Sequence, residues 1–259
     1  MSSNETAAIV TTERDNGILT ITLNRPEVRN AVNAESAQRI AEAMDELDAE
    51  PGLRVGVITG SSGTFSSGMD LKAYLTGERA LVPGRGFAGF VESPPRKPLI
   101  AAVEGYALAG GFEIALACDL IVASSTACFG LPEVKRGLVA AGGGLLRLPQ
   151  RVPSAIALEL GLTGRPMTAR RAYEIGLINR LTPEGQALSV AQRLAAEVVA
   201  NAPLAVQASK RVLVESIHWE TVGRWELQRA ITAPVNSSDD AREGARAFRE
   251  RRPPVWLGR

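Results

Sequence analysis

Two glutamates, Glu113 and Glu133, stand in the most apolar stretch of this chain, residues 99–137. Their neighbours are mostly aliphatic and glycine residues, as in GGFEIALAC and FGLPEVKRG. Ionising an unpaired carboxylate in such surroundings is costly, so each group is either paired, solvated by a cavity, or functional. The alternative for Glu113 is structural, because a glutamate in the first turn of a helix also favours that helix without doing any chemistry.

Acid–base chemistry in this chain would depend on carboxylates, because the single histidine, His218, lies in a polar helical segment far in sequence from the glycine-rich loops. A Ser-His-Asp or Cys-His catalytic site would need a histidine, as would most zinc sites. Two loops, SSGTFSSGMD and GYALAGG, each follow an expected buried strand and precede a helix. One backbone N–H from each loop would form an oxyanion hole, and two carboxylates beside it would suit proton transfer next to a carbonyl. Neither loop has the GxxxxGK or GxGxxG spacing of a nucleotide-binding loop.

The elements that must position these groups form an α/β core. Residues 8–23 alternate in polarity around the turn sequence DNG, which predicts an antiparallel hairpin. Asn33 caps an amphipathic helix, and RVGVITG, LIAAVEG and DLIVAS have the apolar composition of buried strands. Gly110 and Gly111 open a short apolar helix, where free backbone N–H groups can face a ligand oxygen. The succession of strand, helix and strand indicates parallel pairing.

The rest of the chain divides into a loop and a helical tail. Residues 76–98 carry glycines and prolines with little apolar periodicity, so we expect a mobile segment that covers the site. No strand pattern follows Leu181, and four helical segments are expected from Gln186 onward. We therefore expect residues 1–195 to form the core with the active site and residues 196–259 to form a helical C-terminal region. The sequence shows no convincing internal repeat.

Composition excludes several function classes. The net charge of +1 argues against broad electrostatic binding of nucleic acid or of an anionic membrane. Glutamates and glycines interrupt the apolar stretch near residue 110, which argues against a membrane span. Cys118 and Cys128 lack metal-binding or CxxC spacing and are expected to be buried thiols in a reducing compartment. The N-terminal MSSNETAA does not have the pattern of a secretion signal, so the cytoplasm is the expected location.

Six segments stand in order along almost the whole chain: LNRPEVRNAVN, FSSGMDLKAY, AAVEGYALAGGFEIALACDLIVAS, FGLPEVKRGLVAAGGG, LTGRPMTARRAYEIGLINRL and AFRERRPPVWLGR. Each segment alone is a weak signal, but six in this order make chance agreement improbable. Together they resemble the crotonase family, also called the enoyl-CoA hydratase/isomerase family.

This resemblance implies a fold, an assembly and a site. The fold would be crotonase (ClpP/crotonase-like), an α/β spiral of repeated ββα units whose helical C-terminal region forms trimers that usually pair into hexamers. Family members bind acyl-CoA thioesters and stabilise an enolate-like oxyanion with two backbone N–H groups, which here would belong to Met69 and Gly110. The family's hydratases use two glutamates, which match Glu113 and Glu133. Coenzyme A is part of the substrate, so the resemblance implies no separate cofactor and no metal.

The resemblance also implies contacts to coenzyme A. In the family, two segments contact the nucleotide end of coenzyme A and form its adenine pocket, and here they match residues before and after the first expected helix. The family's last helix reaches the coenzyme A of a neighbouring subunit. Lys72 fits either a coenzyme A contact or an ordinary surface lysine, and Arg251 replaces a lysine that is more common in the family. The matching residues are Val28, Arg29, Ser67, Gly68, Asp70, Lys72, Phe248 and Arg251.

The pair of glutamates leads to a hypothesis of hydration. Adding water to a double bond requires activation of the water on one side and delivery of a proton to the α-carbon, for which two carboxylates are useful. The sequence therefore predicts an enoyl-CoA hydratase that converts a trans-2-enoyl-CoA into a 3-hydroxyacyl-CoA, with the base and acid unassigned. The alternatives are a Δ3,Δ2-enoyl-CoA isomerase, a carnitinyl-CoA dehydratase-like hydratase, and a non-enzymatic crotonase-fold module that binds RNA or protein. GGGLLRLP replaces the family's GGTQRL-like segment and Met69 replaces a smaller residue, which leaves the acyl group open.

Overall fold

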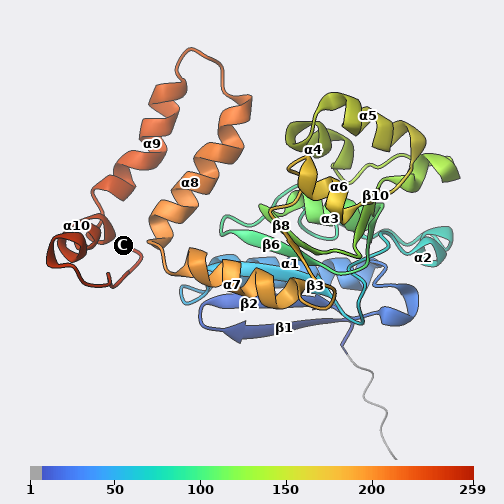
Figure 1. Ribbon diagram of the computed structural model, residues 1–259, viewed down its shortest axis with the longest axis horizontal. Helices are drawn as coiled ribbons and strands as arrows, with labels where there is room; N and C mark the ends of the chain where they lie inside the picture. The colour runs from blue at the N-terminus through green and yellow to red at the C-terminus, as the bar shows by residue number, and fades with distance from the viewer. Residues whose placement is uncertain (1–7) are drawn as a thin grey trace, which may run out of the picture.

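The structure is a computed structural model that describes residues 8–259. Figure 1 shows an α/β body from which three helices near the C-terminus extend to one side. The main sheet has the strand order β1-β2-β3-β6-β8-β11, in which β1 and β2 pair antiparallel and the other neighbours pair parallel. Its strands are β1 (Val10–Asp15), β2 (Ile18–Leu23), β3 (Val55–Gly60), β6 (Leu99–Val103), β8 (Leu120–Ser124) and β11 (Arg180–Thr182).

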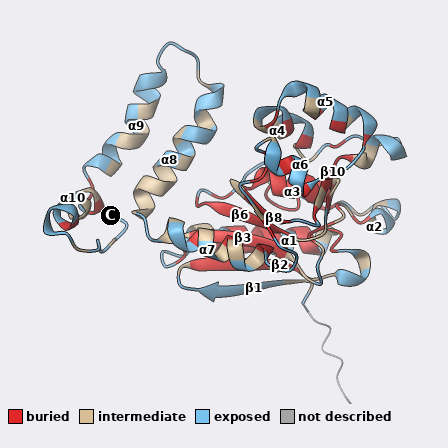
Figure 2. Ribbon diagram, viewed as in Figure 1, coloured by how far each residue is buried: buried red, intermediate tan, exposed pale blue. Residues whose placement is uncertain are grey.

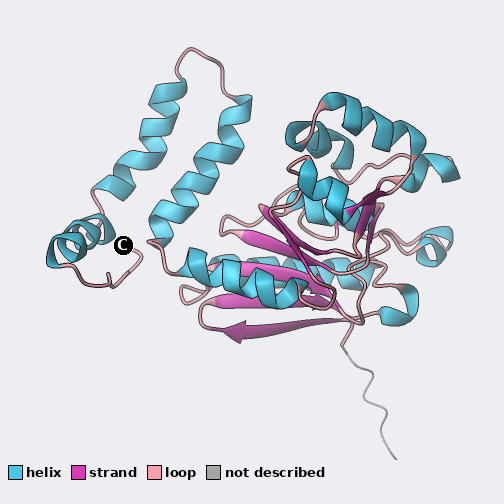
Figure 3. Ribbon diagram, viewed as in Figure 1, coloured by secondary structure: helices cyan, strands magenta, loops and turns pink. Residues whose placement is uncertain are grey.

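Two smaller sheets accompany the main one. A three-stranded sheet has the order β10-β9-β7, and a two-stranded hairpin pairs β4 with β5. These strands are β4 (Leu81–Val82), β5 (Gly86–Phe87), β7 (Tyr106–Leu108), β9 (Cys128–Gly130) and β10 (Met167–Thr168). Figure 3 shows how the short strands lie beside the main sheet rather than within it.

Helices cover both faces of the main sheet and form the tail. The helices of the body are α1 (Ala34–Ala49), α2 (Leu71–Leu75), α3 (Gly110–Ala117), α4 (Gly144–Arg151), α5 (Ser154–Thr163), α6 (Ala169–Glu174) and α7 (Ala187–Val199). Those of the tail are α8 (Pro203–Glu215), α9 (Arg224–Asn236) and α10 (Asp239–Glu250). Three short 3-10 helices complete the chain: η1 (Pro26–Val28), η2 (Pro132–Arg136) and η3 (Ser216–His218).

The central strands are apolar on both faces, as parallel strands covered by helices must be. One face packs against α1 and α3, and the other packs against α7. Helix α7 contributes Ala187, Ala191 and Ala195, which recur every four residues and are completely buried on that face. Figure 2 shows the resulting concentration of buried residues in the body. The sheet is therefore rigidly held, and the loops at the ends of its strands have a fixed support.

The expected core elements are confirmed. The hairpin turns at Asn16 and Gly17, which both have positive φ (46° and 81°), as a two-residue type I′ turn requires. Helix α1 is capped by Asn33, whose side chain accepts a hydrogen bond from Ser36 N. The apolar helix α3 begins at Gly110, and no strand follows β11 in the described residues. Within residues 8–259, no helix is both long enough and apolar enough to span a membrane.

Three expectations about local structure were wrong or incomplete. The segment GYALAGG contains strand β7 and is not only a turn. Residues 76–98 are not a loose cover, because they contain the β4–β5 hairpin and bury Phe87, Ala88, Phe90 and Val91 in the core. Of the two cysteines, Cys118 is buried but Cys128 is only half-buried. Glycines and prolines in these segments make tight turns between buried residues, so their composition alone resembles that of a loop.

A repeat exists in the geometry even though the sequence shows none. Strand β6 of the main sheet is followed by β7 of the small sheet and then by α3, and β8 is followed by β9 and then by η2 and α4. The two units lie side by side, since β6 pairs with β8 and β7 pairs with β9, both in parallel. The chain thus winds as a spiral of strand, strand and helix, and each turn ends in a loop on the same side of the body.

The tail is joined to the body by polar contacts. Lys210 of α8 forms an ion pair with Asp119 (2.6 Å) and donates to the backbone oxygens of Pro95 (2.8 Å) and Lys97 (2.9 Å). Helices α8 and α9 pack against each other as a hairpin that extends away from the body (Figure 1). The boundary expected between residues 195 and 196 falls inside α7, and α8 begins at Pro203.

The chain's last residues fold back on the tail. The buried carboxylate of Asp240 accepts hydrogen bonds from the backbone N–H groups of Leu257 (2.7 Å) and Gly258 (2.9 Å). Trp256 donates its indole N–H to Ala200 O at 2.8 Å. These contacts connect α10 with the junction between α7 and α8, so the tail is held at both of its ends.

Candidate active site

Two backbone loops meet where β7 leads into α3. A Cβ atom at Gly68 would lie 2.7 Å from Gly110 N, and Gly68 has a φ of +95°, so only glycine fits there without strain. Val32 N–H donates to Gly68 O (2.8 Å), and Asp70 N–H donates to Val32 O (2.9 Å). Met69 lies between these two bonds, so its own N–H faces away from Val32.

The N–H groups of Met69 and Gly110 are both available to a ligand. Gly110 is the first residue of α3, and the first N–H groups of a helix have no partner within it. Among the hydrogen bonds of residues 8–259, neither N–H is used as a donor. The helix dipole adds partial positive charge at the same end. The predicted pair of donors therefore comes from two adjoining loops, and its role as an oxyanion hole stays a prediction.

Phe87 supports these loops from the β4–β5 hairpin. A Cβ atom at Gly110 would lie 2.5 Å from Phe87 Cε1 and 3.4 Å from Gly68 Cα. The ring therefore packs directly against the start of α3, and its side chain is buried. The sequence gives no signal of this contact, because the composition of residues 76–98 is that of a mobile segment.

Glu113 lies in the first turn of α3 and is almost completely buried, with 4% of its surface exposed. Its Oε1 atom accepts a hydrogen bond from Gly144 N at 2.9 Å. Glycine is required around it, because a Cβ atom at Gly142 would lie 2.6 Å from Glu113 Oε2. Burial raises the pKa of Glu113, while the N–H groups of Gly144 and Gly142 and the charge of Arg147 act in the opposite direction. These donors hold the carboxylate in a fixed orientation.

Glu133 lies at the start of η2, in the segment that follows β9. Its Oε2 atom is buried and has no hydrogen-bond partner among the described residues. Burial, which is the largest cause, and the nearby negative charge of Glu113 together raise the pKa of Glu133 to about 7, although its own backbone N–H and the charge of Arg136 act in the opposite direction. A buried polar atom without a partner is rare and needs an explanation such as catalysis. The protonated form of Glu133 is thus accessible at neutral pH.

The two carboxyl groups have different environments in one site. Glu113 has hydrogen-bond donors and a cation beside it, which favour its charged form, whereas Glu133 has few such partners. Ala109 N–H donates to Gly130 O (2.9 Å), which connects the loop before Gly110 to the segment before Glu133. The arrangement can accept a proton at one carboxyl group, donate one at the other, and stabilise negative charge on an oxygen between them.

The residues predicted at the nucleotide end of coenzyme A cluster on one side of this site. Ser67 N–H donates to Arg29 O at 3.0 Å, and Ser67 Oγ donates to Val28 O at 3.4 Å. The exposed guanidinium of Arg29 lies over the ring of Tyr106, 5.8 Å from its centroid. The structure therefore brings Val28, Arg29, Ser67 and Gly68 together, and their role in binding coenzyme A stays a prediction.

Asp70 and Lys72 follow on the same loop. The Asp70 side chain caps α2 by accepting from Lys72 N (3.1 Å) and Ala73 N (3.3 Å), and it forms an ion pair with Arg25 at 3.0 Å. Burial alone would raise the pKa of Asp70, but the hydrogen bonds from Ala73 and Arg25 outweigh it and lower that pKa. The Asp70 carboxylate thus has structural partners, whereas Lys72 is exposed.

Phe248 and Arg251 are not part of this cluster. Phe248 lies on α10 with 88% of its surface exposed, and Arg251 is the exposed residue that ends this helix. Figure 1 shows α10 at the far end of the tail, away from the loops around α2 and α3. A contact of these residues with the ligand of their own chain does not fit this placement, and a contact with a neighbouring subunit stays a prediction.

The main residue that sequence reasoning missed is Arg147 of α4. Its Nη2 donates to Val91 O, and its charge acts on Glu113. Arg147 also folds back over the glycine turn, since a Cβ atom at Gly143 would lie 2.3 Å from its Nη1. The segment GGGLLR was recognised only as a departure from the family pattern, and nothing in its spacing shows that it wraps around Glu113.

Neither the histidine nor a metal-binding cluster forms part of this site in the described residues. His218 lies in η3 of the tail, away from the site, as expected. In the part of the chain that the structure describes, no group of three or more histidine, cysteine or acidic side chains is arranged to hold a metal ion.

Known proteins are similar to this chain in sequence and in fold over nearly their whole length. Residues 13–259 match the family described as enoyl-CoA hydratase/isomerase. Enoyl-CoA hydratase EchA19 of Mycobacterium tuberculosis is 40% identical over 270 residues, which cover all of both chains. A carnitinyl-CoA dehydratase of Salmonella paratyphi A is 42% identical, covering 95% of this chain and 97% of the relative. The crystal structure of enoyl-CoA hydratase EchA1 from Mycobacterium marinum superposes with a TM-score of 0.96 at 56% identity, covering 97% of this chain and 99% of that one.

The spiral of ββα units and the two loops with free N–H groups define a crotonase-fold enzyme. The chain belongs to the enoyl-CoA hydratase/isomerase family of the crotonase superfamily. This confirms the fold class, the family and the enzymatic nature predicted from the sequence, and it makes the non-enzymatic module the weakest of the alternatives.

Proposed function

We propose that this protein is an enoyl-CoA hydratase that adds water to the 2,3 double bond of a trans-2-enoyl-CoA and forms a 3-hydroxyacyl-CoA. The observation that carries the proposal is the buried Glu133 Oε2, which has no hydrogen-bond partner in the described residues. A second carboxylate, Glu113, is close enough for its charge to raise the pKa of Glu133. A hydratase needs two proton-transfer groups at neighbouring carbons, and a pair of carboxyl groups with unequal surroundings supplies them.

The environments of the two groups support an assignment of roles. Glu113, whose charged form is favoured by Gly144 N–H and Arg147 against the effect of burial, removes a proton from water as the water oxygen adds to the β-carbon. Glu133, with a pKa of about 7, gives its proton to the α-carbon. The N–H groups of Met69 and Gly110 stabilise the negative charge that develops on the thioester oxygen between these events. A proton then passes from Glu113 to Glu133 through water, which restores the starting state.

The chemistry of the substrate supplies everything else that the reaction needs. The coenzyme A part is carried by the substrate, so no separate cofactor takes part in this proposal. We infer that Val28, Arg29, Ser67, Gly68, Asp70 and Lys72 lie along its nucleotide part.

A second candidate is the dehydration of carnitinyl-CoA, which the relatives with that name favour. This reaction is the reverse of hydration, so the same two carboxyl groups would serve it, and its substrate has a different acyl group. A Δ3,Δ2-enoyl-CoA isomerase would move one proton between carbons and would not consume water, so one of the two glutamates would be dispensable.

We also propose that the chain assembles as a homotrimer or as a dimer of trimers in the cytoplasm, with no nucleic acid or membrane as a partner. Large apolar side chains are exposed along the tail and α5, among them Leu213 (72%), Phe248 (88%) and Leu162 (74%). Subunit contacts would cover such side chains, because protein interfaces bury exposed apolar surface. Light scattering of the purified protein tests the assembly.

The hydratase proposal is tested by the loss of absorbance of a conjugated enoyl thioester. Crotonyl-CoA and a longer trans-2-enoyl-CoA are mixed with the wild type, Glu113→Gln and Glu133→Gln. We expect rapid loss with the wild type and a decrease of kcat by about 10² to 10⁴ in each variant. Activity that survives in Glu113→Gln but not in Glu133→Gln would favour the isomerase. Turnover of carnitinyl-CoA alone would favour the second candidate.

A further inference from the structure

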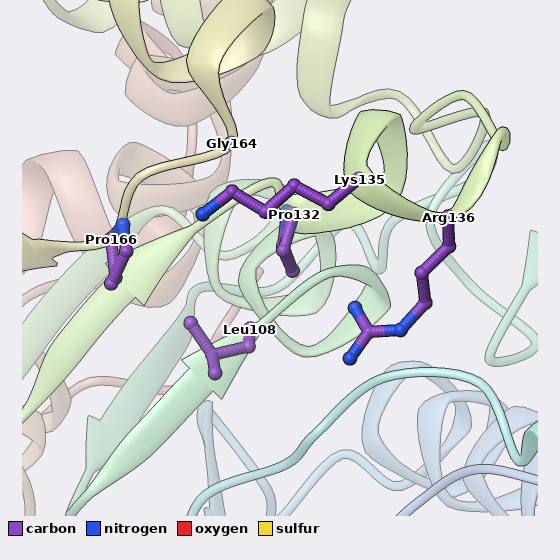
Figure 4. Close-up of a pocket in the computed structure, with 6 residues that line it drawn as sticks. All are labelled: Leu108, Pro132, Lys135, Arg136, Gly164 and Pro166. Carbon is purple, nitrogen blue, oxygen red and sulfur yellow. The ribbon is translucent and has the colours of Figure 1, made fainter.

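A cavity of about 360 Å³ lies beside the active site and has no role in the proposal above. It is lined by Leu108, Pro132, Lys135, Arg136, Gly164 and Pro166. Figure 4 shows the Lys135 side chain extending toward Gly164 and Pro166, and the Arg136 guanidinium pointing toward the side of Leu108. The cavity therefore has apolar walls and a cation on each of two sides.

The cavity borders both halves of the catalytic machinery. Leu108 ends β7, two residues before Gly110, and Pro132 directly precedes Glu133 in η2. Arg136 is close enough to Glu133 for its charge to lower the pKa of that carboxyl group. The cavity therefore lies next to the place where Gly110 N–H would bind a thioester oxygen.

The two cations have no carboxylate partners. Among residues 8–259, neither Lys135 nor Arg136 takes part in an ion pair or a side-chain hydrogen bond, although many of the other arginines do. Both are exposed residues of η2, so water solvates them, and the charge of Arg136 also acts on Glu133. An anion in the cavity would give each group a charge-assisted contact that the described residues do not supply.

The wall that carries Lys135 is built tightly. Gly164 ends α5 with a φ of +60°, and a Cβ atom there would lie 3.1 Å from Val134 Cγ2, 3.2 Å from Lys135 Cε and 3.2 Å from Pro132 Cα. Helix α5 and η2 pack against each other at this point. The Lys135 stem therefore rests against a fixed surface, and less conformational entropy is lost when its ammonium group binds an anion.

We propose that this cavity is an anion subsite of the acyl-CoA site, in which Arg136 and Lys135 bind a phosphate or carboxylate group of the thioester substrate. The inference rests on the proposed function, because it needs an acyl-CoA in the neighbouring site. A neutral alkyl chain would use only the apolar walls and would leave both cations to water, whereas an anion would use the cations as well. The anion belongs either to the phosphates of coenzyme A or to a carboxylate on the acyl group.

The test measures binding rather than turnover, so that it is independent of hydration. Calorimetry gives the Kd of butyryl-CoA, butyryl-pantetheine and glutaryl-CoA for the wild type and for the double variant Lys135→Gln/Arg136→Gln. The matched control is Arg165→Gln, which removes an exposed arginine between Gly164 and Pro166 that does not line the cavity. Circular dichroism checks that each variant is folded.

We expect the double variant to bind glutaryl-CoA about tenfold more weakly, and butyryl-CoA as well if the anion is a phosphate, because charge-assisted contacts at a partly exposed site are lost, whereas Arg165→Gln should bind both ligands as the wild type does. If the anion is a phosphate, the loss disappears with butyryl-pantetheine. If it is an acyl carboxylate, the loss is confined to glutaryl-CoA. Wild-type Kd values for all three ligands in the double variant, or an equal loss in Arg165→Gln, would overturn the subsite.

The two proposals fail in different ways. A wild type that binds butyryl-CoA but hydrates no enoyl-CoA would refute the hydratase proposal, while the Kd values would still decide the subsite. A wild type that hydrates crotonyl-CoA, with a double variant of unchanged KM for neutral and carboxylated enoyl-CoA substrates, would refute the subsite alone.

Discussion

Replacing Glu133 with glutamine is expected to stabilise the fold at every pH above that at which this carboxyl group ionises in the unfolded chain. Burial keeps the group neutral in the folded chain up to a pKa of about 7, against 4.5 for an ordinary glutamate. Below pH 4.5 the group is protonated in both the folded and the unfolded chain. Between pH 4.5 and about 7 only the unfolded chain loses the proton, so the stability of the wild type falls as the pH rises. Glutamine is neutral throughout and lacks this loss.

The size of the effect follows from the difference between the two pKa values. A difference of one pKa unit corresponds to about 1.4 kcal/mol, so a change from 4.5 to about 7 gives an upper value of about 3 kcal/mol. Glu133 is only partly buried, and solvent screens part of the penalty. We therefore expect the free energy of unfolding of Glu133→Gln, relative to that of the wild type, to increase by about 1 to 2 kcal/mol from pH 5 to pH 8.5.

The assay is equilibrium unfolding in urea at pH 5 and pH 8.5, repeated at two protein concentrations to separate folding from assembly. Glu184→Gln, at an exposed glutamate of the loop before α7, is the control and should show the same change with pH as the wild type. A stabilisation of equal size at both pH values, or a less stable variant at pH 8.5, would refute the reasoning. Either result would mean that the fold does not raise the pKa of Glu133 above that of the unfolded chain.

Two further predictions concern the surroundings of Glu113. Gly142→Ala would bring a Cβ atom to 2.6 Å from Glu113 Oε2, so the carboxylate must move. The kcat for hydration should therefore fall by about tenfold or more. Gly52→Ala is the control, because its Cβ atom would have no atom within 4 Å, and it should leave kcat unchanged. Arg147→Gln removes a charge that lowers the pKa of Glu113, so the acid limb of the pH profile of kcat/KM should move to higher pH. Arg151→Gln, one turn further along α4, removes a buried arginine whose Nη2 donates to Cys118 O, and should leave that limb in place; equal shifts in both variants would contradict the assignment.

The main sheet and the helices against it could be predicted because their patterns are local. Strands β3, β6 and β8 read as continuous apolar runs, and α1 shows apolar residues at helical spacing after a capping asparagine. The strands of the small sheet have only two or three residues each, and their pairing depends on contacts across the fold. No local pattern specifies such short strands, which is why β7 resembled part of a turn.

The sequence could predict which groups of the candidate site would do chemistry, but not which residues hold those groups in place. Glu113 and Glu133 are conspicuous as carboxylates in apolar segments, and the loops of Met69 and Gly110 match a family pattern. The roles assigned to them stay predictions. Arg147 and Phe87 could not be found in this way, because α4 and the β4–β5 hairpin reach the start of α3 only through tertiary packing.

The way in which the tail closes has a consequence for the order of events during synthesis. Every strand of the body and the helix α7 that covers its sheet are complete by residue 199, whereas α10 is joined to the junction of α7 and α8 only when residues 256–258 reach Ala200 and Asp240. As a chain leaves the ribosome, the N-terminal parts fold first. The body can thus fold, and Lys210 can attach α8 to it, while α10 is not yet held in place. A nascent chain is therefore most exposed to association with the wrong partner in the interval before residues 256–258 emerge.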